Sequence, residues 1–112
     1  GRGISVANLH LSLGRDDQAT QLSAVGEHLP RKSPFLVVGD FNCTNSSTHL
    51  EAFAEANKAQ IANHPQIPTF PSWRPQRDLD HIVYSDLVSL EHRRSHALQL
   101  SDHLPVSAEI HF

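Results

Sequence analysis

The sequence predicts an α+β fold in which a mostly antiparallel sheet carries helices on one of its faces. Residues 35–38 form an apolar run without a polar side chain, which indicates a strand buried on both faces. Residues 104–112 alternate between apolar and polar side chains, as in a strand with one face toward the core and the other toward solvent or a packed layer. Segments with helical periodicity accompany these strands, and a length of 112 residues favours a single domain.

The first predicted strand covers residues 4–11. Alternate side chains of a strand point to opposite faces, so Ile4, Val6, Asn8 and His10 share one face, and Ala7, Leu9 and Leu11 share the other. The first of these faces changes from apolar to polar along the strand. His10 is therefore expected close to an edge of the sheet.

Two helices are predicted from apolar side chains at helical spacing. The first runs from Asp16 to about Leu29 and is stopped by Pro30. The second opens at Thr48, where Thr48 and Glu51 match the Thr-x-x-Glu capping box. The apolar side chains expected in the core are Leu22, Val25 and Leu29 from the first helix and Leu50, Phe53 and Ala54 from the second.

The rest of the chain is predicted as a loop followed by three strands. Residues 63–75 contain four prolines and are expected to form an ordered loop. A strand pattern returns at residues 79–84, with Asp80 and Ile82 on one face. A further short strand is expected over residues 87–93, before the alternating strand at the end of the chain.

Composition narrows the class of protein. The formal net charge of −3 argues against a broad nonspecific surface for nucleic acid. No apolar run approaches the roughly 20 residues that a membrane span needs. Cys43 is the single cysteine, so no internal disulfide is possible and a reducing, cytoplasmic location is favoured. Cys43 itself is expected to be a buried small residue rather than a nucleophile.

Polar side chains gather where the predicted strands end or begin. His10, Asp40 and Asn42 lie near the ends of two strands, whereas Asp80 and the pair Asp102–His103 precede or begin two others. If these two pairs of strands run antiparallel to each other, all of these side chains collect at one edge of the sheet.

The segment after the apolar run at residues 35–38 is the most informative. If the extended backbone continues, Asp40 and Asn42 point to one side and Phe41 turns into the core. Carboxylates, imidazoles and an amide at a sheet edge fit metal-assisted phosphoryl chemistry. There a divalent cation offsets phosphate charge and activates water, and carboxylates hold the cation.

Four short motifs carry a family resemblance: Asn8-Leu9-His10-Leu11, Gly39-Asp40-Phe41-Asn42, Leu79-Asp80-His81-Ile82 and Ser101-Asp102-His103-Leu104-Pro105-Val106. In this order and at these separations they resemble the C-terminal half of the endonuclease/exonuclease/phosphatase superfamily, which includes DNase I-like nucleases and inositol-polyphosphate phosphatases. The segment Thr69-Phe70-Pro71-Ser72-Trp73-Arg74-Pro75 is similar to that of uncharacterised bacterial members. The resemblance implies a hydrolase that uses Mg²⁺, or Mn²⁺, to cleave a phosphodiester or phosphomonoester with activated water.

The resemblance also implies a role for each matching residue on the first two motifs. His10 resembles the histidine that contacts the scissile phosphate. Asp40 resembles the carboxylate that activates the attacking water and lies close to the metal. Asn42 resembles the amide that hydrogen-bonds the phosphate or the transition state.

The last two motifs supply the remaining roles. Asp80 resembles the partner that orients His103, and Asp102 resembles a carboxylate close to the metal. His103 resembles the residue that stabilises the pentacovalent phosphorane or acts as the base. The resemblance leaves open which of Asp40 and His103 acts as the base.

The resemblance covers only part of the family's catalytic domain. The family's main magnesium ligands are an Asn on the first strand and a Glu in a Gln-Glu motif, and neither motif occurs here; Asn8 belongs to a later motif. Residues 1–112 are therefore expected to form the C-terminal half of a four-layer, DNase I-like α/β sandwich. Alone, this half is expected to be inactive and to need the N-terminal half, or a second copy, across its exposed sheet. The alternative is a non-catalytic binding or assembly module derived from the same fold.

Several other residues have competing interpretations. His81 falls on the opposite strand face from Asp80 and is expected to be structural. Trp73 is equally compatible with packing under its loop and with lining a substrate groove. Arg77 is expected to pair with Asp78 rather than with a substrate phosphate. The remaining histidines are expected at the surface or in packing: His28, His49, His64, His92, His96 and His111.

Overall fold

The computed structural model describes residues 2–62 and 65–112. Two parallel neighbours, β1 (Ser5–His10) and β2 (Phe35–Asp40), begin a four-stranded sheet, and α1 (Arg15–His28) provides the crossover between them. Parallel strands require such a crossover, because a tight turn cannot return the chain to the same end of the sheet. The predicted first strand and first helix are confirmed within one or two residues.

The sheet continues on the other side of β2. Strand β4 (Asp80–Ser85) runs antiparallel to β2, and the edge strand β3 (Ala59–Ile61) runs antiparallel to β4. The strand order is β1-β2-β4-β3. Sequence analysis missed β3, because a three-residue strand is too short to display a period-two pattern.

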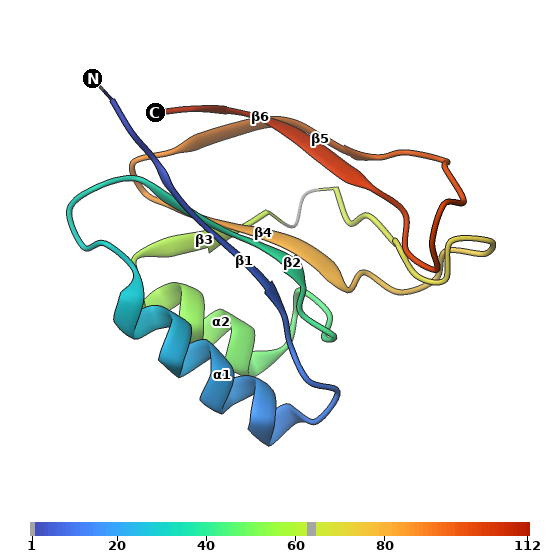
Figure 1. Ribbon diagram of the computed structural model, residues 1–112, viewed down its shortest axis with the longest axis horizontal. Helices are drawn as coiled ribbons and strands as arrows, with labels where there is room; N and C mark the ends of the chain where they lie inside the picture. The colour runs from blue at the N-terminus through green and yellow to red at the C-terminus, as the bar shows by residue number, and fades with distance from the viewer. Residues whose placement is uncertain (1, 63–64) are drawn as a thin grey trace.

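Both helices cover one face of this sheet, as predicted (Figure 1). Helix α2 (Thr48–Ala56) packs beside α1, and the core lies between the helices and the sheet. Leu22 is buried, and Val25 and Leu29 pack at the margin of the same cluster. The fully or nearly buried members of the core are Leu11, Leu22, Phe35, Val37, Phe41, Cys43, Leu50, Phe53, Ala54 and Val83.

The core also contains a polar residue that the apolar pattern did not reveal. Gln18 of α1 is only 2% exposed. Its amide nitrogen donates to the carbonyls of Ser12 (2.8 Å) and Asn42 (3.1 Å), and its oxygen lies 2.7 Å from Nε2 of His49. Because a buried amide is tolerated only when it is hydrogen-bonded, Gln18 ties the loop after β1, the loop after β2 and helix α2 together.

The predicted capping box at Thr48 is wrong by one residue. Ser47 is the N-cap of α2, and no side-chain hydrogen bond caps the helix. The hydroxyl of Thr48 instead accepts a 2.6 Å hydrogen bond from the guanidinium of Arg15 on α1. The Thr48 side chain therefore contributes to contact between helices rather than to the helix end.

Strands β5 (Ser89–Ser95) and β6 (Val106–His111) form a separate antiparallel hairpin on the side of the sheet away from the helices (Figure 1). Strand β5 begins two residues later than predicted. The inner side chains Val106, Ala108 and Ile110 are only half-buried, so the prediction of a full core face for this strand is only partly confirmed. The hairpin is a sheet of two strands, and such a sheet buries little on its own.

On the face of the four-stranded sheet opposite the helices, side chains of neighbouring strands lie side by side across the sheet. Cross-strand registers place Val6 beside Leu36, Val38 beside Ile82, and Asp40 beside Asp80. Moving toward the carboxyl end of β2, this face thus changes from apolar to charged. Within residues 2–62 and 65–112, neither α1 nor α2 has the length and apolar character of a membrane-spanning helix.

Candidate active site

Four of the predicted polar side chains, those of His10, Asp40, Asp80 and His103, meet at one end of the sheet. Asp40 closes β2, and its neighbours in register are His10 at the end of β1 and Asp80 at the start of β4. The antiparallel pairing of β2 with β4 brings this about, as the expected topology required. His103 reaches the same place from the loop before β6.

Gly39 allows β1 and β2 to approach each other just before Asp40. Its φ of +134° lies in a region that residues with a Cβ rarely adopt. A Cβ at this position would lie 2.0 Å from the carbonyl oxygen of Leu9. The glycine of the Gly-Asp-Phe-Asn motif therefore fixes the position of Asp40 relative to β1.

Asp40 lies between two imidazoles. Its Oδ2 is 3.4 Å from Nε2 of His10 and 3.4 Å from Nε2 of His103. The Asp40 side chain is 16% exposed and that of His103 is 22% exposed, whereas His10 is 77% exposed. The carboxylate is thus shielded but reachable, and His10 extends beyond it into solvent.

Asp80 holds the other nitrogen of His103. Its Oδ2 accepts a 2.6 Å hydrogen bond from Nδ1 of His103 and a 2.5 Å hydrogen bond from the hydroxyl of Thr69. An acceptor at Nδ1 sets the orientation of the ring and directs Nε2 toward Asp40.

Sequence analysis gave Thr69 and Phe70 no role at the site. Thr69 is fully buried, and its carbonyl accepts a hydrogen bond from the Leu104 amide. The ring of Phe70 lies 4.9 Å, centroid to centroid, from that of His103. The only signal in the sequence was the segment that begins at Thr69, and no chemical pattern linked it to Asp80 or His103.

The surroundings of His103 change its protonation. Burial by itself lowers the pKa of His103, but the hydrogen bond that His103 donates to Asp80 and the negative charges of Asp80, Asp40 and Asp102 outweigh it, so the pKa is raised above the ordinary 6.5. His103 is therefore more readily protonated than a free histidine near neutral pH.

Asn42 does not lie where an extended backbone would place it. Its φ is +50°, and its amide N–H donates to Oδ1 of Asp40 over 2.9 Å. Its side-chain nitrogen donates to the carbonyl of Leu11 over 2.5 Å. The chain turns sharply at Asn42, so the expectation that Asp40 and Asn42 extend side by side is wrong, whereas the burial of Phe41 is confirmed.

A group of possible metal ligands lies at this site. Donor atoms of Asp40, Asp80 and His103 all lie within 4.8 Å of one another. Asp102 is exposed and is not in that group, and its carbonyl accepts a hydrogen bond from the Ser72 amide. Asp80 already accepts two short hydrogen bonds, so Asp40 is the carboxylate in this group best placed to bind a cation. This donor set could hold a divalent cation, because such an ion is commonly bound through one or two carboxylates, waters and the substrate.

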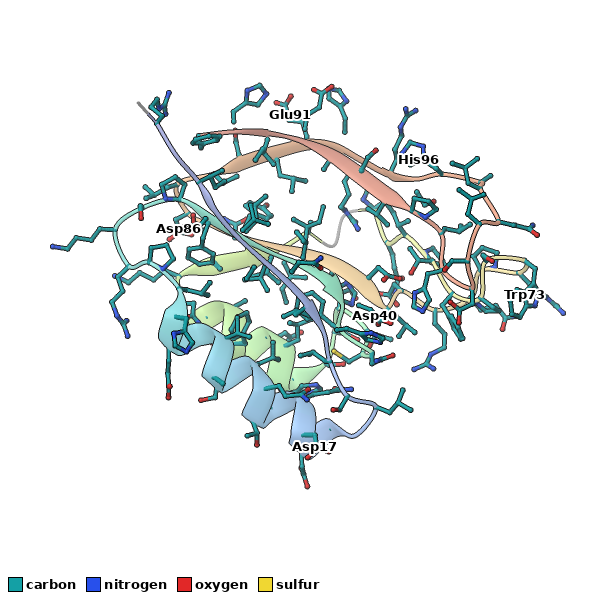
Figure 2. The ribbon with its side chains drawn as sticks, in the orientation of Figure 1. Asp17, Asp40, Trp73, Asp86, Glu91 and His96 are labelled. Carbon is teal, nitrogen blue, oxygen red and sulfur yellow. The ribbon has the colours of Figure 1, made fainter. Side chains whose placement is uncertain are left out.

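The remaining sequence interpretations are resolved by burial. His81 is buried and its Nε2 donates to the carbonyl of Cys43 over 2.6 Å, so it is structural as predicted. Burial raises the pKa of the Cys43 thiol, which fits an inert residue. Trp73 is 67% exposed and points away from the molecule (Figure 2), which excludes packing under its loop.

The predicted pair of Arg77 with Asp78 is absent from the ion pairs of the described residues. Asp78 is buried, and its carboxylate accepts a 3.2 Å hydrogen bond from the Asn45 amide. Its partner is therefore the backbone of the loop after β2. His64 lies outside the described residues.

Comparison with protein families shows which family this chain belongs to. Residues 4–103 match the model of the endonuclease/exonuclease/phosphatase family. This chain belongs to that family. It is also 34% identical over 121 residues to the uncharacterised protein YbhP of Escherichia coli strain K12. That match covers 99% of this chain and 47% of YbhP, so the chain spans about half the length of this relative.

Solved structures share the fold of this chain. The mannosyl-6-phosphatase Bt3783 of Bacteroides thetaiotaomicron superposes with a TM-score of 0.79 and 20% identity, over 94% of this chain and 50% of that one. The human nocturnin catalytic domain, solved with a bound sulfate anion, superposes with a TM-score of 0.63 and 24% identity, over 100% of this chain and 48% of that one. The α+β, DNase I-like fold expected from the sequence is thus confirmed.

Proposed function

We propose that this chain contributes the C-terminal half of a metal-dependent phosphoesterase that hydrolyses a phosphodiester or phosphomonoester with activated water. The observation that carries the proposal is the position of Asp40 Oδ2, at 3.4 Å from Nε2 of both His10 and His103. A carboxylate flanked by two imidazoles can accept a proton from water while cationic groups beside it neutralise the charge of a phosphate.

Each residue of the site has a part in the proposed reaction. Asp80 holds Nδ1 of His103, so Nε2 carries its proton toward the reacting phosphate. The raised pKa of His103 favours the imidazolium, which stabilises charge on the pentacovalent phosphorane. Asp40 then takes the proton of the attacking water, and the exposed His10 contacts a phosphate oxygen.

Asn42 acts at the edge of this group. One N–H of its side-chain amide is used by the Leu11 carbonyl, and the second N–H of the same amide is left for a phosphate oxygen. Its backbone hydrogen bond to Asp40 also holds the carboxylate in place. Asn42 therefore both positions Asp40 and contacts the substrate.

A bound Mg²⁺, or Mn²⁺ in its place, would lower the pKa of water and offset phosphate charge. Asp40 would hold the cation, with Asp102 available from the loop before β6. The family's principal ligands belong to the N-terminal half of the domain. On its own, residues 1–112 would thus bind magnesium weakly and turn over no substrate, and measurable magnesium-dependent hydrolysis by this chain alone would contradict that expectation.

The names of the relatives suggest substrates. One neighbour of the same fold is a mannosyl-6-phosphatase, which favours a sugar phosphate or another small phosphoester. The net charge of −3 weighs against a nucleic acid substrate, although the other half of the domain contributes charge as well.

The decisive test is Asp40→Ala in the intact protein, assayed against a panel of phosphoesters with Mg²⁺. Turnover should fall by about 100-fold or more, since both proton transfer and metal binding are lost. Asp86→Asn is the matched control, because Asp86 is exposed and lies at the opposite end of the sheet from Asp40 (Figure 2). Wild-type turnover by a folded Asp40→Ala protein would remove Asp40 from the mechanism. Absence of hydrolysis of every ester by the wild-type protein would instead favour a non-catalytic binding module.

A further inference from the structure

A second group of ionisable side chains lies on the outer face of the hairpin. Glu91 of β5 and Glu109 of β6 are direct cross-strand partners. Both are exposed, and Figure 2 shows Glu91 pointing outward, away from the four-stranded sheet and from Asp40. Carboxylates directly opposite each other on a hairpin repel, so this pair is unfavourable unless a positive charge lies between them.

Two imidazoles converge on these carboxylates. Nε2 of His111 lies 4.0 Å from Oε2 of Glu91. Nε2 of His92 lies 3.8 Å from Oε2 of Glu91 and 3.7 Å from Oε2 of Glu109. His111 is two residues from Glu109 on the same strand and thus shares its face.

An irregularity in β5 brings His92 to this face. The register shifts between Glu91 and Arg94, so β5 has one residue more than β6 over this stretch. His92 occupies a φ of +54°, which is unfavourable for a residue with a Cβ. In a regular strand His92 would point to the face opposite Glu91; the bulge turns it toward both carboxylates.

From this arrangement we propose a transition-metal site of the zinc class on the hairpin, formed by Glu91, Glu109 and His111, with His92 as a fourth ligand. Donor atoms of the first three already lie within 4.8 Å of one another. A bound zinc needs donors at about 2.0–2.2 Å from the ion, in a tetrahedral arrangement. Exposed Glu and His side chains can close that distance by rotamer changes alone, without moving either strand.

The donor types distinguish this site from a magnesium site. Two imidazole nitrogens with two carboxylates suit Zn²⁺, Cu²⁺ or Ni²⁺, whereas Mg²⁺ prefers oxygen donors and water. A divalent cation would also cancel the repulsion between Glu91 and Glu109. The site lies apart from Asp40 and does not depend on the proposed phosphoesterase activity.

The test measures zinc binding to the intact protein after transition metals have been removed, in a buffer that contains Mg²⁺. Calorimetry gives the zinc affinity, and NMR reports on the imidazole nitrogens. Both measurements are carried out in an Asp40→Asn background, which weakens binding at Asp40, Asp80 and His103. Zinc should shift the ring signals of His92 and His111. Glu91→Gln with Glu109→Gln should weaken the binding at least about tenfold. Glu55→Gln, an exposed change on α2, is the matched control and should leave the affinity unchanged.

Two results would overturn the proposal. One is equal zinc affinity with and without the two Glu→Gln changes; the other is zinc binding that leaves both imidazoles unshifted. If the double variant does not fold, His111→Gln replaces it with the same expectation. If the cluster is held together only by His–Glu ion pairs, zinc will leave the ring signals of His92 and His111 unshifted. That result counts against the site.

Discussion

The carboxylate of Asp80 accepts hydrogen bonds from Nδ1 of His103, at 2.6 Å, and from the hydroxyl of Thr69, at 2.5 Å, on the same oxygen atom. Asp80 thus holds the imidazole ring of His103 at Nδ1, while Nε2 of the same ring faces Asp40. The orientation of His103 in the proposed site therefore depends on the Asp80 carboxylate, which need not contact the substrate.

Asp80→Asn should lower the pKa of His103, since the hydrogen bond and charge of Asp80 raise it. NMR titration of the ring measures this directly, with an expected pKa above 6.5 in the wild-type protein and a lower value in the variant. An unchanged pKa in the folded variant would contradict the assignment of Asp80 as the partner of His103.

The same shift predicts how stability depends on pH. A histidine whose pKa is raised by folding stabilises the protein fully below its unfolded pKa, and this contribution is lost as pH rises through the folded pKa. Urea unfolding should thus show that His103→Gln destabilises more at about pH 5.5 than at about pH 8.5. The reverse order would mean that folding lowers the pKa of His103 instead of raising it.

Thr69→Val should destabilise the protein by about 1–3 kcal/mol, because it leaves the partly buried Asp80 carboxylate without one of its donors. In the intact protein we also expect turnover to fall about tenfold or more, since His103 would be less well oriented. Thr69→Ser keeps the hydroxyl and should restore most of the turnover. Equal losses in the two variants would indicate a packing role only.

Gly39→Ala should be among the most destabilising single changes, lowering the free energy of unfolding by about 3 kcal/mol or more. The new Cβ would lie 2.0 Å from the Leu9 carbonyl, at a φ of +134°. Gly3→Ala is the control, since its Cβ would meet nothing within 4 Å, and it should change stability by no more than about 0.5 kcal/mol. Thermal or urea unfolding compares the two variants, and a mild effect at Gly39 would show that β1 can move away from β2.

The apolar side chains on the sheet face opposite the helices predict self-association of residues 1–112 when they are expressed alone. Val6 is 57% exposed there, and Val38 and Ile82 lie half-buried beside each other. Light scattering should detect dimers or larger species, and Val6→Lys should shift them toward monomer. Leu13→Lys, at an 86% exposed position off the sheet, should have no such effect. A monodisperse monomer at high concentration would contradict this prediction.

Much of the architecture follows from local patterns. The period-two and helical patterns located β1, α1, α2, β4 and β6, and the continuous apolar run at residues 35–38 located β2. The family motifs gave His10, Asp40, Asp80 and His103 as candidates, and the antiparallel pairing of β2 with β4 brings them together. Local patterns failed at β3, which is too short for periodicity, and at the N-cap of α2, which is shifted by one residue.

The amino-acid sequence alone determined the fold class, the family and the residue types of the site, because periodicity and motif order are properties of the chain itself. Only the tertiary structure determined that Thr69 holds Asp80, that Asn42 turns back onto Leu11, and that His92 leaves its expected face to meet Glu91 and Glu109. These contacts join residues across a turn, a loop or a bulge, where backbone geometry and not spacing decides what a side chain touches.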